Sequence, residues 1–93
     1  MILRASKLQK QLKKLSRQDQ TRVVETLQGF LQALKEGPIP QGYGFKKLNG
    51  DKYEIRAGIR LRIVMKLEAD TLICHVAGNH EEVRRYLRTF QNK

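Results

Sequence analysis

Cysteine, tryptophan and long apolar stretches are scarce in this sequence. The one cysteine, Cys74, excludes an internal disulfide framework and is typical of a protein in the reducing cytoplasm. No apolar stretch approaches the roughly 20 residues that cross a bilayer, and the first residues lack the apolar core of a signal peptide. Repeats and low-complexity tracts are absent as well. We therefore expect one cytoplasmic globular domain over residues 1–93, with no membrane span.

Metal ligands and phosphate-binding loops are also lacking. Cys74, His75 and His80 are fewer than the four ligands of a closed zinc site, and neighbours in a strand point to opposite faces. Gly42-Tyr43-Gly44 is too short for a phosphate loop. A nucleophilic Cys74–His80 pair is conceivable, but Cys74 falls in an aliphatic alternation that favours a buried structural thiol. We expect neither a metal ion nor a small-molecule cofactor.

Positive charge, in contrast, is abundant. Nineteen Lys and Arg against nine Asp and Glu give a net charge of +10. Residues 1–36 hold eight basic and three acidic residues and residues 37–93 hold eleven and six, so each part is +5 and the excess is no detachable tail. Such a field attracts nucleic acid, an anionic membrane or an acidic protein, and its plainest alternative is a well-solvated surface.

The N-terminal third has the apolar spacing of helices. Apolar residues recur every three or four positions over residues 5–15, with lysines between them, and again over 17–36. Ser16 is a suitable N-cap for the second helix, and Gly37, followed by two prolines, ends it. Two helices joined by a tight turn predict an antiparallel helical hairpin.

After Gly37 the apolar period changes from helical to alternating, which predicts an antiparallel meander. We expect strands over residues 53–56, 60–67 and 72–76, with turns at 57–58 and 68–70 and a fourth strand over 45–48 joined through Asn49-Gly50. The face predicted to pack on the helices carries Leu61, Ile63, Met65, Leu72, Cys74 and Val76. The opposite face carries Glu54, Arg56, Arg60, Arg62 and His75.

A last helix follows the meander. Asn79 is a good N-cap, with Glu82 three residues on. The apolar stripe of this helix would cover Val64 and Ile73, and it consists of Val83, Leu87 and Phe90. The predicted fold is α+β: an N-terminal helical hairpin on a three- to four-stranded antiparallel sheet, with a C-terminal helix.

The sheet face opposite the hairpin offers the clearest chemistry. Arg56, Arg60 and Arg62 on adjoining strands would form a concentrated cationic surface. The planar guanidinium donates two parallel hydrogen bonds to phosphate, so these arginines could hold successive phosphates or stabilise charge at one scissile phosphate. Arginines that merely keep a sheet face soluble are an equal alternative.

An ordered set of short motifs resembles the RelE/ParE toxin superfamily. The motifs are Phe45-Lys46-Lys47-Leu48, Tyr53-Glu54-Ile55-Arg56, Gly58, Arg62-Ile63-Val64 and Val76-Ala77-Gly78-Asn79-His80. The resemblance covers nearly the whole chain, and it implies a helical hairpin on a sheet. Glu54 stands where some members have a catalytic lysine, Tyr86 lies two residues past the usual tyrosine position, and a first strand is shortened to Met1–Arg4 at most.

The resemblance implies a function too. RelE-like members cleave mRNA on the ribosome and are held inactive by an antitoxin, whereas ParE-like members poison DNA gyrase. By motif position, the catalytic residues would be Arg56 and Arg62, which stabilise charge, and His80, an acid or base. His75, predicted on the same face as the arginines, is an alternative acid or base. We assign RNA binding to Lys46, Lys47, Arg60, Arg84, Arg85 and Tyr86.

Two partners follow from this reading: mRNA on the ribosome, and an antitoxin whose acidic segment wraps the basic surface. The alternative is a non-enzymatic gyrase inhibitor or a basic binding module that uses the same surfaces without His80. An RNA chaperone is a third reading. The lack of tryptophan disfavours it, because few aromatic platforms are available for stacking bases.

Overall fold

The computed structural model describes residues 2–48 and 50–91, with the side chains of Phe90 and Gln91 excepted. Its strands are β1 (Ile2–Arg4), β2 (Lys46–Lys47), β3 (Lys52–Ala57), β4 (Leu61–Glu68) and β5 (Thr71–Gly78). Its helices are α1 (Ser6–Leu12), α2 (Arg17–Glu36) and α3 (His80–Gln91), with a short 3-10 turn at Gln41–Tyr43. No helix within these ranges is long and apolar enough to cross a membrane.

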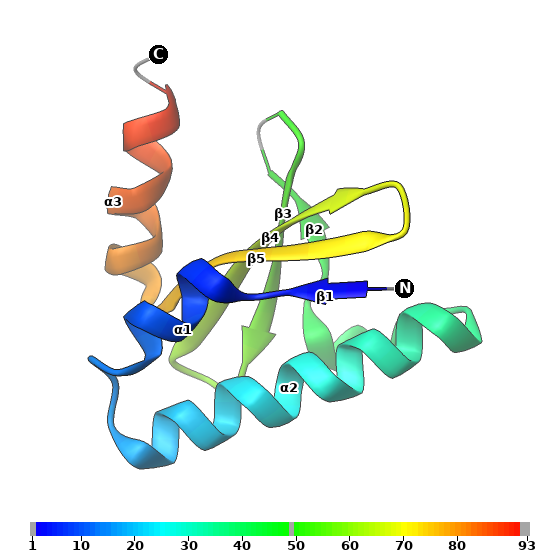
Figure 1. The fold of residues 1–93 in the computed structure, drawn as a ribbon, viewed down its shortest axis with the longest axis horizontal. Coiled ribbons are helices and arrows are strands. Elements are labelled where there is room, and N and C mark those ends of the chain that lie inside the picture. The colour runs from blue at the N-terminus through cyan, green and yellow to red at the C-terminus, as the bar shows by residue number, and fades with distance from the viewer. Residues whose placement is uncertain (1, 49, 92–93) are drawn as a thin grey trace.

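The strands form a single sheet in the order β1-β5-β4-β3-β2 (Figure 1). β1 runs parallel to β5, while the other neighbours are antiparallel. The predicted antiparallel strands correspond to β2–β5, but the prediction lacked a fifth strand, β1, which runs parallel to its neighbour at the edge of the sheet. Three residues are too few to show an alternating pattern, and β1 pairs with a strand far along the chain, so no local signal marks it.

The predicted helical hairpin also needs correction. α1 packs against β5, whereas α2 crosses β3 and β4, so the two helices lie on one face of the sheet without pairing along their lengths (Figure 1). Because α1 directly follows the edge strand β1, its position beside β5 is set by that strand. α1 is shorter than predicted, since residues 13–15 form a turn that leads to Ser16.

The predicted ends of α2 are confirmed. Ser16 Oγ accepts a hydrogen bond from the Asp19 N–H at 3.1 Å. The helix ends at Glu36, and the Gly37 N–H donates to the Ala33 carbonyl at 3.0 Å with a φ of 130° at Gly37. A capped start and a glycine stop fix which face of α2 meets the sheet.

The main core lies between the sheet and helices α1 and α2. Leu61, Ile63 and Met65 face these helices as predicted, and each is almost fully buried. The other core residues come from both helices and from β3 and β5: Leu8, Val23, Leu27, Phe30, Ile55, Ala57, Leu72, Cys74 and Ala77. The apolar period thus correctly identified the buried face of β4.

A second, smaller cluster lies on the opposite face, beneath α3. Val64 and Val83 are buried in it, so the predicted cover of Val64 by the last helix is confirmed, with Leu87 packed alongside. The side chain of Phe90, predicted for the same stripe, lies outside the described residues. Val76 joins this cluster rather than facing α1 and α2 as predicted.

A β-bulge explains the reversal of Val76. Val64 pairs with Val76 and Met65 pairs with Cys74, which leaves His75 as an extra residue on β5. One extra residue shifts the alternation, so Cys74 faces the main core and Val76 faces α3. The alternation of the sequence alone gives no sign of this bulge.

The predicted turns of the meander have different outcomes. Ala57 still belongs to β3, and the turn comprises residues 58–60, with a φ of 80° at Gly58. The predicted turn after β4 is confirmed, with Ala69 at a φ of 54°. Asn49, predicted to join β2 to β3, lies outside the described residues.

Candidate nucleic-acid interface

The candidate site is the sheet face opposite α1 and α2, which we call the open face. Its side chains are Glu54 and Arg56 of β3, Arg62, Val64 and Lys66 of β4, and His75 and Val76 of β5. α3 leaves this face at one end of the sheet and stands out from it (Figure 1). The alternation of β3 and β4 puts the charged residues here, because the intervening positions face the main core.

Two arginines lie side by side at one end of the open face. Arg56 is the direct cross-strand partner of Arg62, and Arg62 is paired in turn with Gly78. Side chains in such pairs have Cβ atoms about 5 Å apart, and like charges there repel. Neither arginine forms an ion pair with any described residue. The pair is therefore available to an anion, which would relieve the repulsion.

The loop before β2 holds Arg56 in place. A Cβ atom at Gly44 would lie 3.0 Å from Arg56 Nε, so the backbone of Gly44 permits the close approach of the guanidinium stem. Gly44 also has a φ of 57°, which favours glycine. The Arg56 side chain therefore reaches the edge of the sheet, where it lines a shallow hollow together with Thr26 of α2, Pro40 and Tyr43.

His80 begins α3 close to this arginine pair. It is exposed, and it lies two residues beyond Gly78, the partner of Arg62. The predicted cap at Asn79 is confirmed: Asn79 Oδ1 accepts from the Glu82 N–H at 2.8 Å, and Glu82 Oε1 accepts from the Asn79 N–H at 3.0 Å. The reciprocal cap fixes the direction in which the chain leaves the sheet at His80.

The other predicted binding residues are more dispersed. Lys46 lies on the open face, where its Nζ is 3.5 Å from Glu54 Oε2. Glu54 is the one charged residue that is buried among those described, with 7% of its surface exposed. Lys47 pairs with Tyr53, a core-facing residue, so it projects to the opposite side from Lys46.

Arg60 does not lie on the open face as predicted. It belongs to the turn before β4, and its Nη2 is 3.5 Å from Oδ1 of Asp19 on α2. The predicted strand began one residue too early, at a position where the turn directs the side chain toward the helical layer. Arg60 therefore lies on a different side of the sheet from the Arg56–Arg62 pair, and any contact that it makes with RNA would be separate from that pair.

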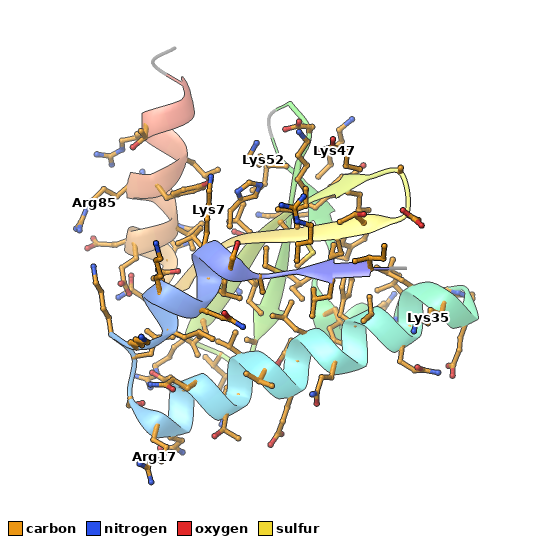
Figure 2. The ribbon with its side chains drawn as sticks, in the orientation of Figure 1. Lys7, Arg17, Lys35, Lys47, Lys52 and Arg85 are labelled. Carbon is orange, nitrogen blue, oxygen red and sulfur yellow. The ribbon has the colours of Figure 1, made fainter. Side chains whose placement is uncertain are left out.

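α3 carries a basic outer face and an aromatic inner face. Arg84 and Arg85 are exposed and line a shallow hollow with Glu81 and Arg88. Figure 2 shows Arg85 pointing away from the sheet. Tyr86 instead packs toward the open face, against the cluster of Val64 and its neighbours.

The sequence placed His75 on the open face and left it as an alternative acid or base to His80. Both ring nitrogens are shielded from solvent and have no hydrogen-bond partner in the described part of the chain. The Tyr86 ring centroid is 6.3 Å from that of His75. Burial lowers the pKa of His75, and the positive charges of Lys52, Lys7 and Lys66 lower it further, against a smaller opposing effect of Asp51.

Ion pairs occupy the end of the open face beside His75. Asp51 accepts from Lys52 Nζ at 2.9 Å and lies 3.2 Å from Lys66 Nζ, which is also 3.1 Å from Glu68. Hydrogen bonds from Lys52 and Lys66 lower the pKa of Asp51 to about 2. These lysines are thus engaged with carboxylates, unlike the arginines at the other end.

Cys74 is a buried thiol that lies apart from the open face. Burial raises the pKa of Cys74 to about 12, and its side chain belongs to the main core, away from His80 on the surface. It is the buried structural thiol that the sequence favoured. Across the described ranges, no group of three or more His, Cys, Asp or Glu side chains is placed to hold a metal ion.

Comparison with known proteins yields matches among solved structures. No protein-family profile matches the sequence, and no curated protein is significantly similar to it. A copper-bound mutant toxin from Helicobacter pylori has a TM-score of 0.67 at 20% identity, over 89% of this chain and 98% of that one. E. coli YafQ has a TM-score of 0.66 at 16% identity, over 89% and 96%.

A crystal structure of the E. coli DinJ–YafQ complex matches as well, with a TM-score of 0.67 at 17% identity, over 89% of this chain and 96% of that one. At such identities the likeness is one of fold. The protein has the fold of these toxins, the same fold that its motifs implied through their resemblance to the RelE/ParE superfamily.

Proposed function

We propose that this protein is the toxin of a toxin–antitoxin pair and that it cleaves mRNA on the ribosome without a metal ion. The observation that carries the proposal is the cross-strand Arg56–Arg62 pair, which has no carboxylate partner in the described ranges. His80 follows two residues after Gly78, the strand partner of Arg62. A toxin fold and a net charge of +10 support it.

The proposed reaction is a transfer of the phosphate within the RNA. A ring nitrogen of His80 accepts the proton of a 2′-hydroxyl, and the 2′-oxygen bonds to phosphorus. The bond from phosphorus to the 5′-oxygen breaks, and the leaving oxygen takes up a proton from water. Arg56 and Arg62 stabilise the negative charge that develops on the phosphate oxygens.

We assign binding of the RNA backbone to lysines and arginines around this centre. Lys46 lies on the open face, and Arg84 and Arg85 extend the positive charge along α3. Lys47 and Arg60 would contact RNA or ribosome from the flanks of the sheet. Phosphate contacts of this kind position the RNA without reading its sequence.

We further propose a cytoplasmic antitoxin whose acidic segment covers the basic surface. YafQ has been crystallised with DinJ as a toxin–antitoxin complex, and this protein shares the fold of YafQ. Attraction between exposed charges is screened by salt, so binding should weaken as the salt concentration rises. A neighbouring reading frame whose product does not bind this protein would contradict a regulated toxin.

The direct test replaces one arginine of the pair. Arg62→Ala should reduce single-turnover cleavage of mRNA on programmed ribosomes by about 10²–10³-fold, the loss typical of one charge-stabilising donor, and Arg56→Ala should act in the same direction. Arg17→Ala is the matched control, because Arg17 is exposed at the start of α2, on the far side of the helical layer (Figure 2). Cleavage by both pair variants at the wild-type rate would show that the arginines do not handle phosphate.

A further inference from the structure

His75 is a half-buried residue whose ring nitrogens are shielded from solvent, and the proposed reaction does not use it. Its two ring nitrogens are the buried side-chain polar atoms that lack a hydrogen-bond partner in the described part of the chain. Burying such atoms without a partner costs free energy, so native proteins rarely keep them unless a ligand or a function requires it. His75 is moreover the residue that the β-bulge inserts, so the backbone of β5 is locally rearranged at this position.

Several elements converge around this imidazole. Tyr86 of α3 places its ring 6.3 Å from His75, at an interplanar angle of 32°. Lys52 of β3, Lys66 of β4 and Lys7 of α1 are near enough to influence its protonation, as is Asp51. All three lysines favour the neutral imidazole, and only Asp51 opposes them.

The imidazole lies on the same face as the proposed catalytic centre, farther along the strands. His75, the extra residue between the Val64–Val76 and Met65–Cys74 pairs, lies two to three residues along the strands from Arg62, which corresponds to about 7–10 Å. An RNA strand whose phosphate sits on the arginine pair could therefore extend over the open face toward His75.

The side chains around His75 suit a nucleobase better than a phosphate group. A neutral imidazole presents one N–H donor and one acceptor, and nucleobase edges present donors and acceptors side by side. An aromatic ring such as that of Tyr86 supplies a stacking surface. Two of the neighbouring lysines are engaged by Asp51 and Glu68, so the cationic character that phosphate needs is largely neutralised here.

We propose that His75 and Tyr86 form a nucleobase pocket that takes a base flanking the scissile phosphate and sets the base preference of cleavage. The claim that the bound base flanks the cut rests on the proposed function. The claim that the pocket binds a base does not. Rotation of the half-buried Tyr86 side chain would admit the base, which would then stack on Tyr86 and hydrogen-bond to His75.

Binding can be tested without cleavage by NMR on the full-length protein. The His75 ring signals are followed while each of the four ribonucleoside 5′-monophosphates is added, with ribose 5-phosphate as the control that lacks a base. We expect saturable shifts at His75 with at least one nucleotide and none with ribose 5-phosphate. Signals that stay unmoved by all four, or that shift equally with ribose 5-phosphate, would overturn the pocket.

Specificity is tested by mapping cleavage sites on programmed ribosomes. His75→Gln and His75→Ala should change the ratio of cleavage between sites that differ in one flanking base by about tenfold, the scale of a hydrogen-bonded base contact. The loss at the preferred site should appear in KM more than in kcat. Ile73→Val, a neighbouring substitution on the same strand, should keep the wild-type ratio, and an unchanged ratio in both His75 variants would contradict the proposal. If the wild-type protein cuts no mRNA, the proposed function is contradicted but the pocket is not. The NMR titration still decides whether a base binds.

Discussion

Single side chains on the open face differ in how their charges and polar atoms are satisfied. Lys46, Lys52 and Lys66 are paired with carboxylates, whereas Arg56 and Arg62 have no such partner among the residues described. Removing a surface lysine from an ion pair usually changes stability little. Removing an arginine that holds a reacting phosphate changes rate instead, so the two groups are separable by experiment.

We expect His75 to make the free energy of unfolding depend on pH. The folded-state pKa of His75 is lowered from 6.5, so below about pH 6.5 the unfolded chain binds more protons than the folded chain. The stabilising contribution is complete above 6.5 and is lost as the pH falls toward the folded-state pKa. In urea unfolding between pH 7.5 and 5, His75→Gln should therefore lose less unfolding free energy than the wild type. His80 is present in both proteins, so the difference reports His75, and equal pH slopes would contradict the burial of its ring.

A second prediction about a single residue concerns Gly29, a glycine within α2. A Cβ atom at Gly29 would collide with the Tyr43 hydroxyl, while the next Tyr43 atom, Cζ, is 3.7 Å away. Gly29→Ala should therefore destabilise the wild type, although alanine normally favours a helix by about 1 kcal/mol over glycine. In a Tyr43→Phe background, where the hydroxyl is absent, the same change should stabilise by about that amount. Equal effects in both backgrounds, measured by chemical denaturation, would show that the contact does not restrict the position.

At the scale of elements, α3 depends on its reciprocal cap and on a small apolar cluster. Asn79→Ala removes the side-chain acceptor of the Glu82 N–H and should cost about 1 kcal/mol of unfolding free energy. Glu82→Gln keeps an acceptor for the Asn79 N–H and should cost less. Because His80 begins α3, Asn79→Ala should also slow cleavage. If Asn79→Ala kept the wild-type free energy of unfolding and the wild-type cleavage rate, the apolar cluster alone would position the helix.

Elements with long, regular patterns were predictable from sequence, and elements defined by distant contacts were not. The 20-residue helix α2 has both of its predicted ends, and β4 has its predicted buried face. The family resemblance allowed a short strand within Met1–Arg4, but the apolar pattern did not place β1 in the sheet, because three residues carry no period and its partner β5 is far along the chain. The orientation of Val76 was wrong because a bulge changes alternation without leaving a mark in the composition.

The candidate site was predictable to the same extent. Arg56 and Arg62 were placed on one face by alternation, and the structure makes them direct partners. Arg60 was misplaced because the boundary between turn and strand shifts by one residue, which moves it to Asp19 on the helical layer. The enclosure of His75 by Tyr86 arises from the packing of α3 on the sheet, which local spacing cannot specify.

At the scale of the whole molecule, a toxin fold and a net charge of +10 fit both a nuclease and an inhibitor of a nucleic-acid enzyme. Charge alone favours binding to any polyanion, including ribosomal RNA and DNA complexes. The proposal of chemistry over binding rests on the Arg56–Arg62 pair and on His80, which follows the strand partner of Arg62 by two residues. Binding alone would need only the distributed lysines and arginines.

The most direct measurement incubates the purified protein with mRNA-programmed ribosomes and, in parallel, with gyrase and relaxed plasmid. We predict that the mRNA is cut on the ribosome, that His80→Gln abolishes most of this cleavage while it keeps the fold, and that supercoiling proceeds normally. Inhibited supercoiling with intact mRNA, or arrested translation on uncut mRNA, would contradict the proposed ribonuclease and show that the basic surfaces act by binding alone.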